Sequence, residues 1–86
     1  MATLLVFHEV DDVDHWLAST RREDFFGPLG ITTRTFRDPT GTSRVGLIVD
    51  VPDVAAFEAS MQTEGAAEAM RADGVRPDTL LVLAEA

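Results

Sequence analysis

The chain has 86 residues and a formal net charge of −8, with 15 acidic and 7 basic side chains. A protein that binds the nucleic-acid backbone needs a basic surface to neutralise phosphates, so we expect no nucleic-acid partner. Cys, Lys, Tyr and Asn are missing from the sequence. Their absence excludes a thiolate nucleophile, a Schiff-base lysine, a phenolic acid and an asparagine oxyanion donor within one chain.

The size of the chain predicts one domain, covering residues 1–86. A chain this short buries only about 60–65% of its unfolded surface, so a monomer would be marginally stable. No apolar run approaches the roughly 18 residues of a membrane span, and the first residues lack the basic region of a signal peptide. We therefore expect a cytoplasmic protein with no membrane contact.

A strand-into-helix passage occurs twice in the sequence. Val10 and Trp16 recur as Val51 and Phe57, an offset of 41 residues, close to half the chain. In each copy an apolar run ends in the Val, and an Asp stands two residues later, where it can cap a helix. The sequence therefore predicts two half-domains of the same design.

The first half-domain begins with a predicted strand at residues 3–10, apolar on both faces and hence central in its sheet. Asp12 is expected to cap a helix that bends or frays around residues 23–26 and stops at the following Gly-Pro pair. Arg21 and Arg22 should lie nearer solvent on this helix. Residues 31–37 form a Thr-rich strand whose low apolar content is typical of a sheet edge.

The second half-domain repeats this order. A turn leads to a second two-sided strand at residues 44–51, and Asp53 caps the next helix. Gly65 is expected to break this helix, so that a short extra helix covers residues 66–73. The last strand, residues 79–84, is again apolar on both faces. The order β-α-β-β-α-β is the ferredoxin-like plan, an α+β fold with a four-stranded antiparallel sheet.

The sheet face turned away from the helices would expose Leu5, Phe7 and Ile48. Such a patch is too apolar for a soluble monomer, and a second copy packed sheet to sheet would cover it. The sequence therefore predicts a homodimer.

Three features in this order carry a resemblance to a known group of proteins: the His-x-Val-x-Asp-x-x-x-Trp passage at residues 8–16, the hairpin residues Phe36-Arg37-Asp38, and Glu68-Ala69-Met70 followed by Gly74-Val75. In these features the chain resembles the small bacterial dimeric α+β barrel proteins, related to the antibiotic-biosynthesis monooxygenase-like group, some of which are called cyclases. The resemblance implies a homodimer with facing sheets and a pocket between sheet and helices in each subunit.

In the better-known relatives this pocket binds polycyclic aromatic substrates or haem, and it often works without a separate redox cofactor. Haem-degrading relatives use an Asn in the first strand, with His and Trp on later elements. This chain has no Asn, and its one Trp lies on the first predicted helix. Haem degradation is therefore not supported, and we expect no cofactor.

His8 is the candidate catalytic residue, because it interrupts the aliphatic strand face of Leu4, Val6 and Val10 that should lie beneath the helices. A polar group at that position must be hydrogen-bonded or meet a cavity, and an imidazole can move protons near neutral pH. The competing interpretation is a core histidine whose polar atoms are satisfied by a backbone carbonyl or an acid near the helix start.

The ligand-binding residues that we predict are His8, Trp16, Phe25, Phe26, Arg34 and Phe57. The aromatic side chains are expected to form pocket walls and mouth, although each also suits a plain packing role. Arg34 is a candidate for holding an anionic group of the ligand, with a surface or dimer ion pair as the expected alternative.

No metal site is predicted, although acids and two histidines cluster between residues 8 and 15. His8 and Glu9 should point to opposite sheet faces, and Asp12 is already used by helix amides. Two function classes remain. One is a small-ligand pocket protein, such as a cofactor-independent enzyme acting on an aromatic or polyketide-like compound. The other is a non-catalytic dimeric module that senses a ligand or binds another protein.

Overall fold

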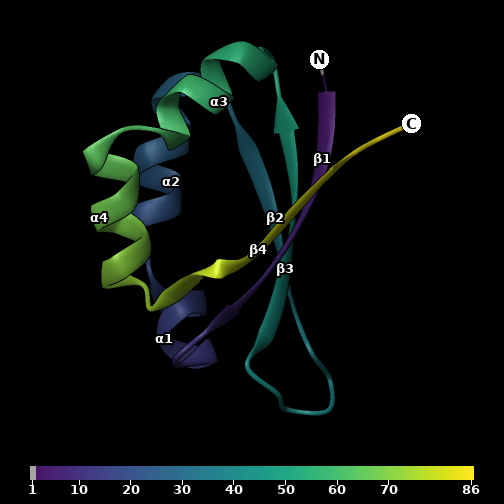
Figure 1. Cartoon of the computed structure of the whole chain (residues 1–86), viewed down its shortest axis with the longest axis vertical. Coiled ribbons are helices and arrows are strands. Elements are labelled where there is room, and N and C mark those ends of the chain that lie inside the picture. The colour runs from purple at the N-terminus through teal and green to yellow at the C-terminus, as the bar shows by residue number, and fades with distance from the viewer. Residues whose placement is uncertain (1) are drawn as a thin grey trace.

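The computed structural model describes residues 2–86. The elements are β1 (Ala2–Val10), α1 (Val13–Ala18), α2 (Arg21–Phe26), the 3₁₀ turn η1 (Gly27–Leu29), β2 (Thr32–Arg37), β3 (Arg44–Val51), α3 (Val54–Met61), α4 (Glu64–Ala72) and β4 (Val75–Ala84). The strands form an antiparallel four-stranded sheet in the order β2-β3-β1-β4. The helices lie on one side of this sheet (Figure 1). The predicted ferredoxin-like α+β fold is confirmed, with β1 and β3 in the centre and β2 at an edge.

The two half-domains start their helices in the same way. Asp12 and Asp53 share an extended backbone, with φ/ψ of −144°/110° and −139°/107°. Each carboxylate accepts a 3.2 Å hydrogen bond from the amide three residues on, that of His15 or Ala56. The repeat predicted from the sequence is therefore present as two equivalent helix caps.

Replacing Asp12 or Asp53 with Ala is expected to lower the free energy of unfolding by about 1 kcal/mol, because one helix amide loses its acceptor. Urea denaturation followed by circular dichroism measures this loss. Asp14→Ala is the control, because Asp14 lies in the same first turn but its side chain is 85% exposed and caps no amide. An equal loss in all three variants would mean that general charge effects, not capping, set the result.

The first helix ends earlier than the sequence suggested. The predicted bend around residues 23–26 is wrong in position, since α1 stops at Ala18 and α2 begins at Arg21. Ser19 adopts an extended backbone, and its hydroxyl accepts a hydrogen bond of 3.2 Å from the Arg21 amide. A serine hydroxyl that bonds a nearby amide offers the backbone an alternative to the helix, which explains the break.

The boundaries in the second half also differ from expectation. Helix α4 begins at Glu64 rather than after Gly65, because the Thr63 hydroxyl caps it by accepting the Ala66 amide at 3.2 Å. It ends at Ala72, and Gly74 just beyond it has a φ of +74°, the left-handed conformation that glycine adopts without strain. Strand β4 starts at Val75, before the predicted residue 79, and it contains Pro77 because an edge strand tolerates a missing amide donor.

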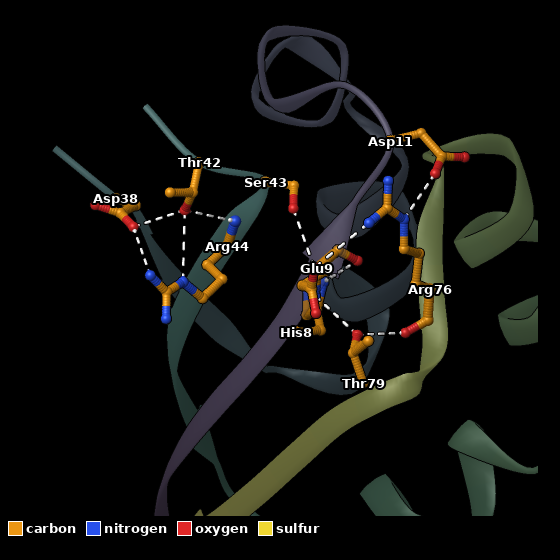
Figure 2. Close-up of polar contacts among 9 residues, drawn as sticks. All are labelled: His8, Glu9, Asp11, Asp38, Thr42, Ser43, Arg44, Arg76 and Thr79. Atoms are coloured by element: carbon orange, nitrogen blue, oxygen red, sulfur yellow. Dashed lines mark hydrogen bonds and ion pairs between the residues drawn. The ribbon is translucent and has the colours of Figure 1, made fainter. Parts of the chain in front are cut away.

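Strand β4 bulges opposite His8. Phe7 pairs with Leu81 but Glu9 pairs with Arg76, so residues 77–80 of β4 face a single residue of β1. Figure 2 shows that Thr79 connects the two strands at the bulge. Its hydroxyl accepts a hydrogen bond of 2.8 Å from the Glu9 amide and donates one of 2.6 Å to the Arg76 carbonyl. A bulge of this kind redirects side chains.

Asp38 organises the hairpin loop between β2 and β3. Its carboxylate accepts hydrogen bonds from the Thr40 amide at 2.8 Å and the Thr40 hydroxyl at 2.7 Å. It also accepts from the Thr42 hydroxyl at 2.6 Å and from Arg44 at 3.5 Å (Figure 2). The Thr42 and Thr40 hydrogen bonds lower the pKa of Asp38 to about 2.

A titration by nuclear magnetic resonance should therefore give Asp38 a midpoint near 2, below its ordinary value of 3.8. A depressed acid contributes stability that is complete above its unfolded pKa and is lost as the pH falls through the folded pKa. The loop should consequently loosen only on acidification from about pH 4 towards pH 2. In Thr42→Val the midpoint should rise, since the first of these donors is removed. An unshifted midpoint in the intact protein would contradict the hydrogen-bonded loop.

The two sheet faces differ sharply in burial. The helix-side face and the helices bury the core of Leu4, Val6, Val10, Trp16, Ile31, Val45, Leu47, Val49, Val51 and Phe57. The other face, which we call the open face, carries Leu5, Phe7, Phe36, Leu81 and Leu83, each 37–51% exposed. No helix among residues 2–86 has the length and apolarity needed to cross a membrane.

Candidate functional site

A cavity of about 80 Å³ lies between the helix-side face of the sheet and the helices. Every strand except β2 and every α-helix contributes to its wall. The lining is largely apolar, with a few polar groups at one part of the wall. The lining residues are Val6, His8, Trp16, Arg21, Arg22, Phe25, Phe26, Leu47, Val49, Phe57, Met61, Ala66, Ala69, Met70, Asp73, Val75 and Leu80.

His8 lies on β1 with its side chain beneath the helices and is 6% exposed. Its Nδ1 is 3.4 Å from the Glu9 carbonyl, and its ring meets that of Trp16 edge to face at 5.4 Å between centroids. Among residues 2–86 the ring is hydrogen-bonded through Nδ1 alone, and no buried side-chain nitrogen there lacks a partner, so Nε2 borders accessible space. A ring nitrogen without a protein partner on a cavity wall can interact with a ligand.

Burial lowers the pKa of His8 below its ordinary value of 6.5, and the nearby positive charge of Arg22 lowers it further, while the Glu9 carbonyl opposes the shift. The imidazole is therefore neutral at pH 7. A neutral imidazole can accept a proton, so His8 can serve as a base in this cavity.

Trp16 is the most buried of the candidate residues, at 1% exposed. It projects from α1 onto the sheet because the Asp12 cap fixes where the helix starts. The guanidinium of Arg22 lies 4.3 Å from the centroid of its ring, and Arg22 also donates a 2.9 Å hydrogen bond to the Trp16 carbonyl. Trp16 thus connects His8 on the sheet with Arg22 on α2.

The phenylalanines form an aromatic chain along the same cavity. Phe25 and Phe26 end α2 with their rings 5.4 Å apart, and Phe26 lies 6.0 Å from Phe57 on α3. Although Phe25 and Phe26 are neighbours in sequence, both line the cavity. The structure therefore brings together five of the six residues predicted to bind a ligand: His8, Trp16, Phe25, Phe26 and Phe57.

Arg34 is the exception. It lies on β2 directly across from Ile48 and therefore on the open face, away from the cavity. Its guanidinium is 5.7 Å from the ring of Phe36. The proposed role for Arg34 in holding an anionic group is not available at this cavity, because the two faces of a strand alternate.

Three charged residues at the cavity, Arg21, Arg22 and Asp73, were missed by sequence reasoning. Asp73, just after α4, is 3% exposed and lies 3.4 Å from Arg21 and 3.9 Å from Arg22. A first helix that continued past Ser19 would leave both arginines nearer solvent. The break at Ser19 changes the direction of α2 and turns Arg22 inward, where burial lowers its pKa and Asp73 opposes that shift.

The acids of residues 9–12 are engaged elsewhere. Glu9 and Asp11 lie 3.4 Å and 2.9 Å from the Arg76 guanidinium, and Glu9 also accepts from Ser43 at 3.1 Å (Figure 2). Asp12 caps α1. Within residues 2–86 no three acids or histidines are grouped closely enough to hold a metal ion.

Comparison with known proteins places the fold among solved structures. No family model matches the sequence, and no curated protein is significantly similar to it. The crystal structure of an antibiotic biosynthesis monooxygenase superposes with a TM-score of 0.65 at 13% identity, covering 100% of this chain and 97% of that one. A candidate antibiotic biosynthesis monooxygenase from Deinococcus radiodurans gives 0.57 at 11% identity, covering 100% and 91%.

A third structure is a conserved protein of unknown function from Bacteroides thetaiotaomicron, described as a possible oxidoreductase, with a TM-score of 0.55 at 15% identity and coverage of 98% and 92%. All three comparisons span nearly the whole of both chains, so the likeness extends over the full β-α-β-β-α-β order. This chain has the ferredoxin-like fold that the antibiotic biosynthesis monooxygenase structures also have.

Proposed function

We propose that this protein binds a small, flat, largely apolar compound in the cavity beside His8 and acts on it as a cofactor-independent, monooxygenase-like enzyme. The observation that carries the proposal is the neutral imidazole of His8, whose Nε2 has no partner among residues 2–86 and which lines a largely apolar wall. Apolar walls with a few polar groups are typical of ligand-binding sites. The apolar walls bury the ligand surface, and a hydrogen bond from a polar group fixes its orientation.

The chemistry that suits this site begins with proton removal. His8 takes a proton from an activated CH₂ group of the substrate, and the apolar walls keep water away from the resulting carbanion. Oxygenation of that group is balanced without an external reductant, since CH₂ and O₂ give C=O and H₂O. The substrate itself supplies the electrons, which fits a chain with no redox-active side chain of its own beyond Trp16 and the methionines.

The cavity limits what can enter. Its volume of about 80 Å³ is smaller than the roughly 150 Å³ of an engineered apolar cavity that accepts benzene. A single ring therefore needs some side chains to move. Met61 and Met70 line the wall, and unbranched methionine side chains adapt readily to a new neighbour. A polycyclic ligand would lie only partly inside.

We propose further that the working unit is a homodimer packed through the open face. Leu5, Phe7, Phe36, Leu81 and Leu83 lie together there, and no helix among residues 2–86 covers them (Figure 1). A contiguous apolar face of this kind marks an interaction surface in a soluble protein. The additional buried area would also support a core that is small for an independent domain.

The test is native mass spectrometry of the protein purified from its own host, followed by oxygen-uptake assays with the compound that it retains. His8→Ala should keep binding but lose turnover by about 10²-fold or more, the typical contribution of a positioned base. His15→Ala is the matched control, because His15 lies outside the cavity lining with its Nε2 2.9 Å from the Ala72 carbonyl. Full turnover in His8→Ala would refute the catalytic role.

A ligand-sensing module is the second candidate function. The observation that favours it concerns the other charged groups that residues 2–86 place on the cavity wall, which are Arg21, Arg22 and Asp73. The one acid among them, Asp73, lies 3.4 Å and 3.9 Å from the two arginines, so within this part of the chain His8 has no free second proton-transfer group beside it. Retention of a ligand that is never altered, in the intact protein and in His8→Ala alike, would favour this function.

A further inference from the structure

The polar part of the cavity wall carries more positive than negative charge. Arg21 and Arg22 supply two cations, Asp73 supplies one carboxylate, and the buried His8 is neutral. The surplus is one positive charge, in a protein whose net charge is −8. Asp73 is shared between the two guanidinium groups, and the charge of Glu23 on α2 also acts on Arg22, so the surplus is that of the lining residues alone.

Arg22 is the cation placed to act inside the cavity. Its side chain is 15% exposed, whereas that of Arg21 is 51% exposed. Its Nη1 donates to the Trp16 carbonyl at 2.9 Å, but the Asp73 carboxylate at 3.9 Å is too distant for a hydrogen bond. Among residues 2–86, its Nε and Nη2 have no hydrogen-bonding partner.

A guanidinium group has five N–H donors, and a planar oxyanion such as a carboxylate matches two of them at once. The donors of Arg22 that are not used by Trp16 are therefore available to a ligand at the cavity wall.

A purely structural role for Arg22, in which it ties α2 to α4, does not explain the long distances between Asp73 and the two arginines. Such a contact would be a short, bidentate pair with Asp73, as is common for buried arginine and carboxylate groups. The contacts of Asp73 are instead 3.4 Å and 3.9 Å, divided between two arginines. The geometry leaves Arg22 incompletely paired. Because no buried side-chain nitrogen among residues 2–86 lacks a partner, its unused N–H groups border accessible space.

We propose that the cavity selects an anionic ligand, a small apolar compound whose carboxylate binds Arg22 while its apolar body lies against Phe26 and Phe57 within reach of His8. This inference rests on the proposed function, because it names the ligand class for the same cavity. It also orients the ligand: with the carboxylate fixed at α2, the opposite end of the molecule points along the aromatic chain.

The test uses three probes of nearly equal size and different charge: benzoate, benzamide and benzylammonium. Binding is followed by the fluorescence of Trp16, the one tryptophan of the chain, which lines the cavity. Benzoate is expected to bind at least about tenfold more tightly than benzamide, because a hydrogen bond to a charged group is stronger than a neutral one. Benzylammonium is expected to bind most weakly.

Three variants locate this preference. Arg22→Met should bring benzoate down to the affinity of benzamide, while Arg22→Lys should retain most of the charge preference. Arg34→Met is the matched control, since it removes a cation from the open face and should change neither affinity. If Arg22→Met does not fold, the ratio of benzoate to benzamide affinity in the unaltered protein still decides the question.

The outcomes separate this inference from the proposed function. Equal binding of benzoate and benzamide, or tighter binding of benzylammonium, would overturn the anionic ligand and leave the ligand cavity standing. The loss of preference in Arg34→Met but not in Arg22→Met would also overturn it. No response of Trp16 to any of the three probes would count against both.

Discussion

Phe7→Asp and Leu81→Asp are each expected to convert the protein from a dimer into a monomer. Phe7 and Leu81 pair directly across β1 and β4 and are 43% and 51% exposed on the open face. In a dimer packed through this face, either substitution would bury an unpaired carboxylate in an apolar contact, which is costly. Because both side chains already contact solvent in the single chain, the fold of the monomer should survive.

Light scattering measures the change directly. The unaltered protein should have twice the chain mass of 9.3 kDa at micromolar concentration, and both variants should have the mass of one chain. Val54→Asp is the control, since Val54 is 37% exposed but lies at the start of α3 on the helix side of the sheet. A monomeric unaltered protein would disprove the proposed dimer, and a monomeric control would mean that the open face is not the contact.

Trp16→Ala is expected to lower the free energy of unfolding by about 3–5 kcal/mol, the usual cost of removing a buried aromatic side chain. Trp16 is 1% exposed and fills the junction between β1, α1 and α2, where it contacts both His8 and Arg22. Removing it leaves a void beside the existing cavity and takes the supporting ring away from Arg22. For a small domain this is a large part of the total stability.

Urea denaturation followed by far-ultraviolet circular dichroism is the suitable measurement, because the variant has no tryptophan fluorescence. Trp16→Phe is the companion variant: it keeps an aromatic face for Arg22 and should lose distinctly less stability than Trp16→Ala. A loss below about 1 kcal/mol in Trp16→Ala would show that the site is loosely packed, since well-packed aromatic residues cost several times more.

Patterns among residues close in sequence were sufficient to predict the helix caps and the strand faces that occur in both half-domains. The caps at Asp12 and Asp53 were predicted correctly because a carboxylate two residues beyond a strand satisfies amides within its own first turn. The side of the sheet on which His8 lies was also predicted, since strand alternation depends only on parity. These features follow from neighbours in sequence, and they placed five of the six proposed ligand residues at one cavity.

Features that depend on contacts between distant segments were not predictable in this way. Arg22 was expected near solvent because the helix was taken to continue past Ser19, and Asp73 drew no attention because its partners lie about 50 residues away in sequence. Arg34 was placed with the ligand although its strand turns it to the open face. Only the folded arrangement of α2 against α4 reveals which charges lie at the cavity.

The sequence by itself determined the order of the elements, the two helix caps and the faces of the central strands, because each depends on hydrogen bonds and periodicity within a few residues. The tertiary structure alone decided the break at Ser19, the bulge of β4 opposite His8 and the inward position of Arg22 and Asp73. The physical reason is that these features form where separate segments compete for the same space and the same hydrogen-bonding groups. Residues that are close in sequence do not determine which segment prevails.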